Sequence, residues 1–124
     1  MISQFEEVTS PLNEEEEHIV KITVQAFESM QTGKQHAISS KEIMNKFYTN
    51  LNISLKEPRV RKLIQHIRYH NLVFGLCANS NGYYVASDAK EFYETLVSLK
   101  ERIEMQTATY NALISQYVIL YGKQ

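Results

Sequence analysis

The fold of this chain is decided by the stretch between Ser39 and Val85. It contains the segments Ser39-Ser-Lys-Glu-Ile-Met-Asn-Lys-Phe47, Pro58-Arg-Val-Arg-Lys-Leu-Ile-Gln-His-Ile-Arg68 and Asn81-Gly-Tyr-Tyr-Val85. The first two segments repeat apolar residues at helical spacing. The third places Asn-Gly beside β-favouring residues, a hairpin signal because both central residues of such a turn must tolerate positive φ. The stretch therefore predicts two short helices followed by a two-stranded hairpin.

Helix starts are indicated by a short polar residue followed three positions later by glutamate, since each side chain can then cap a backbone N–H of the other residue. The pairs are Asn13/Glu16, Ser39/Glu42, Ser54/Glu57 and Asp88/Glu91. We expect helices over residues 14–30, 40–50 and 55–71, and a longer one after Asp88. Pro58 either lies in the first turn of the third helix or, at its first position, moves the start of that helix later. Residues 72–78 and 83–86 are strand-like, Ser80-Asn81-Gly82 is expected to form the turn between them, and residues 36–38 could add a third short strand.

The apolar spacing gives each of the first three helices a buried side. On the first helix it comprises Ile19, Ile22, Ala26, Phe27 and Met30; on the second, Ile43, Met44 and Phe47, with Tyr48 as a further candidate; on the third, Val60, Leu63, Ile64 and Ile67.

Length and composition limit the class of protein. A chain of 124 residues suits one compact domain with one long appendage, and 44% hydrophobic with 22% charged residues excludes a disordered chain. No apolar run approaches the roughly 20 residues of a membrane span. The single cysteine, Cys77, excludes an internal disulfide. The first residues lack the pattern of a signal peptide, so we expect a cytoplasmic protein without membrane contact.

The net charge of −1 is distributed unevenly. Residues 1–33 carry seven acidic residues against Lys21 (−6), residues 34–90 carry nine basic against three acidic residues (+6), and residues 91–124 carry three basic against four acidic residues (−1). A basic middle segment favours contact with a polyanion. The acidic run at 14–17 suits the first turn of a helix, and shielding of a basic surface is the alternative.

The third helix concentrates residue types that bond base edges or phosphates. Opposite its apolar side it presents Arg61, Lys62, Gln65, Arg68 and Tyr69, with His66 at the edge. Arginine bonds guanine, glutamine bonds adenine, and lysine and tyrosine bond the backbone. The alternative is a solvated basic face. We expect the DNA contacts to come from Arg59, Arg61, Lys62, Gln65, Arg68 and Tyr69, with phosphate contacts from Lys41 and Lys46 on the preceding helix.

The C-terminal segment carries a heptad repeat. Apolar residues spaced alternately by four and three positions form a seam with one polar interruption, at Gln106: Phe92, Leu96, Leu99, Ile103, Tyr110, Leu113, Tyr117 and Leu120. Such a seam predicts dimerisation between copies of the chain, and packing on the chain's own first helix is the alternative. We expect the chain to divide into an acidic N-terminal helix that packs on the domain or on a partner (1–33), a helix-turn-helix domain with a hairpin (34–87) and a long C-terminal helix for dimerisation (88–124).

Other chemistry finds little support. His66 and His70 have the i, i+4 spacing of a zinc pair, but no glutamate lies between them and Arg68 does. The sequence contains no phosphate-binding glycine loop and no Ser, His and Asp residues in the order of a catalytic triad. We therefore expect no catalytic residue, metal or small-molecule cofactor.

Residues 34–90 resemble the winged helix-turn-helix family, in particular its small bacterial and phage members. The three segments quoted above carry the likeness. It implies a mainly helical fold with a small hairpin wing, and duplex DNA binding with the third helix in the major groove. Many members carry Arg or Lys at the wing tip, whereas Ala78-Asn-Ser-Asn81 is uncharged. Either the wing contacts DNA through amides or the domain binds protein.

Two hypotheses follow. The first is a dimeric duplex-DNA-binding protein of transcription control or phage DNA metabolism, whose two third helices occupy half-sites about one DNA turn apart. The second is a protein-protein interaction adaptor built on the same scaffold with a coiled-coil arm. The adaptor would bind its partner independently of salt and would depend on the seam.

Overall fold

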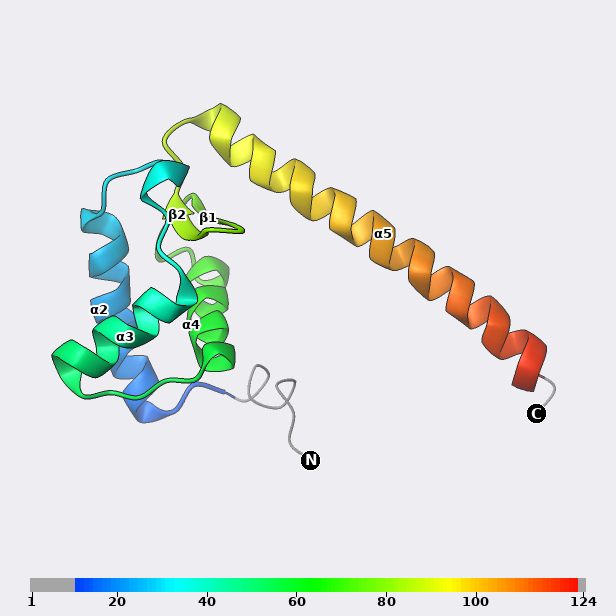
Figure 1. Ribbon diagram of the computed structural model, residues 1–124, viewed down its shortest axis with the longest axis horizontal. Helices are drawn as coiled ribbons and strands as arrows, with labels where there is room; N and C mark the ends of the chain where they lie inside the picture. The colour runs from blue at the N-terminus through cyan, green and yellow to red at the C-terminus, as the bar shows by residue number, and fades with distance from the viewer. Residues whose placement is uncertain (1–10, 123–124) are drawn as a thin grey trace.

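The computed structural model describes residues 11–122, and it is mainly helical with one small antiparallel hairpin (Figure 1). The elements in chain order are α2 (Glu14–Ser29), the 3-10 turn η1 (Lys34–His36), α3 (Ser40–Leu51), α4 (Glu57–Tyr69), β1 (Leu76–Asn79), β2 (Gly82–Val85) and α5 (Ala89–Tyr121). The expected class is thereby confirmed at this level. The first residues of the chain, on which the expectation about a signal peptide rests, lie outside the described residues, and so do the acidic residues Glu6 and Glu7.

The predicted capping boxes of α2 and α3 are both present. Glu16 N–H donates to Asn13 Oδ1 (2.8 Å), and Asn13 N–H donates to Glu16 Oε1 (3.1 Å). At α3, Glu42 N–H donates to Ser39 Oγ (3.1 Å), and Ser39 N–H donates to Glu42 Oε1 (3.0 Å). These reciprocal bonds satisfy backbone donors that a helix start otherwise leaves open, so both helices begin where the sequence predicts.

The predicted cap at Ser54 is wrong. The N-cap of α4 is Lys56, which makes no side-chain capping bond, and Pro58 lies in the first turn. α3 ends at Leu51 with Asn52 as a left-handed C-cap (φ 55°), residues 53–55 have no regular secondary structure, and Lys56 is extended, so α4 begins only at Glu57. At α5 only half of the predicted box forms: Asp88 accepts from Glu91 N–H, while the Glu91 carboxylate accepts from the N–H groups of Ser87 and Lys34.

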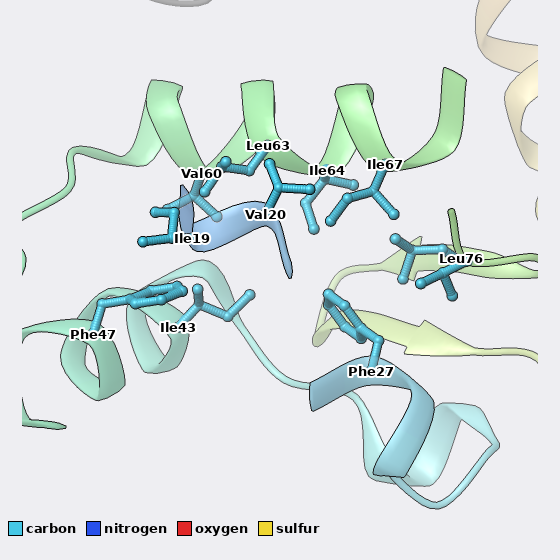
Figure 2. Close-up of a cluster of buried hydrophobic side chains, with 11 residues drawn as sticks. Ile19, Val20, Phe27, Ile43, Phe47, Val60, Leu63, Ile64, Ile67 and Leu76 are labelled. Carbon is cyan, nitrogen blue, oxygen red and sulfur yellow. The ribbon is translucent and has the colours of Figure 1, made fainter. Parts of the chain in front are cut away.

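The core lies between α2, α3, α4 and the hairpin (Figure 2). All four apolar residues predicted for α4 are buried, together with Ile19, Val20, Phe27, Ile43, Phe47, Val73 and Leu76. Two predictions are wrong, since Ala26 and Tyr48 are exposed. Ala26 lies with Ile22 along an apolar groove of ≈430 Å³ between α2 and α3. The buried side of α2 is therefore turned toward α4 relative to the predicted one, and it includes Val20 and Thr23.

The hairpin is shorter than predicted. The pairing runs from Leu76↔Val85 to Asn79↔Gly82, with Ser80 and Asn81 in the loop. The turn lies at Ser80 and Asn81, within the predicted Ser80-Asn81-Gly82, but positive φ occurs only at Gly82 (131°) and not at Asn81. A Cβ at Gly82 would collide with the carbonyl of Ile38, so glycine is required there.

The predicted third strand is reduced to a single bridge. Ile38 and Tyr83 exchange two backbone hydrogen bonds of 2.8 Å, while His36 belongs to η1. Residues 72–75, expected in the first strand, instead form turns after Asn71, which has a φ of 56°. The bridge attaches the segment before α3 to the hairpin, so that α3, α4 and the hairpin form one body.

α5 is one uninterrupted helix of 33 residues, about 50 Å long at 1.5 Å per residue. It leaves the hairpin and extends away from the other elements (Figure 1). Its first turns contact the domain through Tyr84 Oη and Thr95 Oγ1 (3.2 Å) and through Lys34 Nζ and Glu94 (3.6 Å). None of its residues is buried, so the seam does not pack on α2. No helix within residues 11–122 is long and apolar enough to cross a bilayer.

Candidate nucleic-acid interface

α4 has two sharply different sides. Val60, Leu63, Ile64 and Ile67 are at most 2% exposed and face the core. On the opposite side lie Arg61 and Tyr69, both exposed, and Lys62, Gln65 and Arg68, which are half-buried. No acidic residue follows Glu57 in this helix. The sequence-predicted face is thus present as one surface, which we call the basic face: Arg61, Lys62, Gln65, Arg68 and Tyr69.

Polar contacts link the side chains of the basic face to one another. Lys62 Nζ donates to Gln65 Oε1, and Gln65 Nε2 donates to Tyr69 Oη, both at 3.5 Å. The three residues lie at positions i, i+3 and i+7, so they form a line of donors and acceptors about 10 Å long on the helix surface. Both contacts are long enough to be exchanged for bonds to a ligand.

Arg68 ties the basic face to the hairpin. Its Nε–H donates to the carbonyl oxygen of Leu76 at 2.9 Å. Leu76 is the first residue of β1, so the bond fixes the strand against the last turn of α4. Arg68 therefore has a structural role in addition to the predicted contact with DNA.

Arg59 does not belong to the basic face. Its Nε donates to Glu16 Oε2 (2.7 Å), and its Nη2 donates to Glu16 Oε1 (2.5 Å) and to the carbonyl of Pro11 (2.9 Å). The side chains of Arg59 and Glu16 are only 12% and 3% exposed. The pair joins α4 to the start of α2, so Arg59 is an internal anchor and we remove it from the predicted DNA contacts.

This ion pair controls the titration of Glu16. The hydrogen bonds from the Arg59 guanidinium, more than the bond from Asn13 N–H, hold the pKa of the carboxyl below its usual 4.5, although burial acts in the other direction. Glu16 also closes the capping box of α2 through Oε1. One carboxylate thus caps one helix and fixes the start of another.

The two histidines at the end of α4 stack on each other. The rings of His66 and His70 stack with centroids 4.1 Å apart, and burial, with His70 nearby, lowers the pKa of His66. Within residues 11–122 no group of three or more potential metal-binding side chains comes together. By helical projection, His66 lies at the edge of the basic face beside Lys62, and His70 lies further around the helix, toward the apolar side.

The two lysines predicted on α3 lie in different places. Lys41 shares a cleft of ≈340 Å³ with Glu57 at the start of α4 and with the hairpin tip, residues 78–83. Lys46 lies instead along the groove between α2 and α3. The structure therefore brings Lys41, but not Lys46, beside the start of α4 and the uncharged hairpin tip.

In comparisons with protein-family models, curated proteins and solved structures, no match to this chain is found. Any assignment of function therefore depends on the geometry described above.

Proposed function

We propose that the domain formed by α2, α3, α4 and the hairpin is a winged helix-turn-helix and that it binds duplex DNA through the basic face of α4. The observation that carries this proposal is the segregation on α4. Four apolar residues anchor one side in the core, and the other side presents only basic, amide and phenolic groups. A helix held in this way can enter the major groove without rearrangement of the fold.

The dimensions and chemistry of α4 fit this role. Its 13 residues extend about 20 Å, and the major groove of B-DNA, about 12 Å wide, admits one helix. Arg61 and Gln65 are of the residue types that read guanine and adenine, whereas Lys62 and Tyr69 suit phosphate oxygens. Lys41 lies near the start of α4 and supplies a further phosphate contact. Transcription control or phage DNA metabolism are the processes in which we expect such a protein to act.

The test is fluorescence anisotropy of a labelled random-sequence duplex, titrated with the protein at several salt concentrations. The variant carries Arg61→Gln and Lys62→Gln. The matched control carries Lys21→Gln and Lys90→Gln, which remove the same charge from exposed positions on α2 and at the start of α5. We expect the first variant to reduce the slope of log affinity against log salt by about two and the control to leave it nearly unchanged. Equal effects of the two variants would overturn the proposal.

The alternative of a protein-binding adaptor is favoured by one observation, the uncharged hairpin tip. Residues 78–82 present amide, hydroxyl and small side chains where a DNA-binding wing commonly carries cations. The same titration separates the two functions. Absence of duplex binding even at low salt would assign the basic face to a protein partner.

A further inference from the structure

The seam of α5 is exposed along the whole helix. Its eight apolar residues, from Phe92 to Leu120, are between 41% and 67% exposed. At about 200 Å² for a large side chain, these fractions amount to roughly 900 Å² per chain. Each partner of a standard protein interface contributes about 800 Å². A soluble monomer rarely exposes a continuous apolar patch of this size, so the seam has the dimensions of an interface.

The seam does not face its own domain. The residues of α5 that line the side toward the hairpin include Glu94, Thr95 and Ser98. At 100° per residue, the first half of the seam lies roughly 120° around the helix axis from them. A second helix can therefore lie along the seam without displacing the contacts of α5 with the hairpin.

Charge along α5 restricts what can cover it. All its charged residues lie between Lys90 and Glu104, and none occurs from Met105 to Tyr121. The face of a partner helix that contacts the second half must therefore be uncharged and mainly apolar over about 25 Å, with large residues at alternating spacings of three and four. α5 has these properties itself. A heptad seam is also self-complementary, because the projecting residues of one copy fit the holes of another.

We propose that α5 is a self-association helix whose partner is α5 of a second copy of this chain, joined through Phe92, Leu96, Leu99, Ile103, Tyr110, Leu113, Tyr117 and Leu120. The inference does not rest on DNA binding. It also explains how a helix with no buried residue is maintained, since an isolated helix gains little stability without tertiary packing.

The experiment is sedimentation equilibrium of the full chain over a range of concentrations. The seam variant carries Ile103→Gln and Leu113→Gln. The matched control carries Met105→Gln and Ile119→Gln, two exposed residues of the same helix that lie off the seam. Glutamine is a good helix former, so both variants preserve helix propensity. We expect the unmodified chain and the control to sediment at twice the 14.4 kDa of one chain. The seam variant should associate roughly a thousandfold or more weakly.

Each outcome decides the proposal. A mass of one chain for the unmodified protein at all concentrations, or equal weakening by the two variants, overturns it. If the unmodified protein sediments with a mass greater than two chains, and only the seam variant lowers that mass, the same surface is supported. More than two copies then associate through it. Duplex titration of the same samples keeps the two proposals separate, because a dimer without DNA affinity refutes the proposed function and leaves the self-association intact.

Discussion

Replacing Arg59 by methionine tests whether the buried ion pair positions α4. Methionine has a similar length and keeps the apolar part of the contact, but it removes both hydrogen bonds to the Glu16 carboxylate. The Glu16 side chain is 3% exposed. Of the hydrogen bonds to its carboxylate described above, the variant keeps only the one from Asn13 N–H. Removing one partner of a buried pair typically costs about 3–5 kcal/mol. We expect the lower end, about 3 kcal/mol at pH 7, because this remaining bond partly satisfies the carboxylate.

The pH dependence of this cost identifies its origin. In the unmodified chain the pKa of Glu16 is lowered, so the pair contributes its full stability above the usual pKa of 4.5 and loses it as pH falls through the lower folded value. In Arg59→Met, burial without the cation raises the pKa of Glu16. As pH falls, the Glu16 carboxylate is therefore protonated, and the destabilisation of the variant becomes smaller. The difference in unfolding free energy between the two proteins should therefore shrink between pH 7 and pH 3.

The assay is urea unfolding followed by circular dichroism at pH 7, 5, 4 and 3. The control is the double variant Glu16→Gln with Arg59→Met, which removes both charges and keeps a residue that can close the capping box. We expect the double variant to recover most of the loss at pH 7. A single variant within about 0.5 kcal/mol of the unmodified chain, or one whose deficit is the same at every pH, would refute the reasoning.

Three further predictions follow from single positions. Gly82→Ala should lower the unfolding free energy by about 2 kcal/mol or more, because the new Cβ collides with the carbonyl of Ile38 at a φ of 131°; an unchanged urea midpoint would contradict this. Ser39→Ala should cost about 1 kcal/mol in the same assay, whereas Ser54→Ala should change stability by less than about 0.5 kcal/mol, since only Ser39 caps a helix. Gln106→Leu should tighten self-association about tenfold in sedimentation equilibrium, because it removes the polar interruption of the seam; weaker association would contradict it.

The elements that the sequence predicts well are those determined by neighbouring residues. α2, α3 and α5 begin at their predicted caps, and the four core residues of α4 are correct, because capping and helical periodicity act within one or two turns. The start of α4 was not predictable in the same way. There, the left-handed Asn52 and the extended Lys56 accompany the later of two possible starts, and the Ser-x-x-Glu pattern alone does not distinguish them.

What the sequence could not supply is the pairing of distant residues. Glu16 and Arg59 are 43 positions apart, and nothing in either local pattern names the other as its partner. One signal was nevertheless present. Projected at 100° per residue, Arg59 lies about 120° from the centre of the basic face, on the side of His66 and His70. That projection already separates Arg59 from the other predicted DNA contacts, although it cannot say what Arg59 binds.

The ion pair also changes the meaning of the charge asymmetry. Within the acidic run at 14–17, the sequence suggested either a solvated helix start or a shield for a basic surface, but Glu16 is buried and anchors α4. Of the basic residues after it, Arg59 is bound to Glu16, Lys34 is paired with Glu94, and Arg68 bonds Leu76. Part of the net positive charge of residues 34–90 thus stabilises the fold. The case for DNA binding therefore depends on the placement of Arg61, Lys62 and Gln65 on one side of a fixed helix, and not on how many basic residues the segment contains.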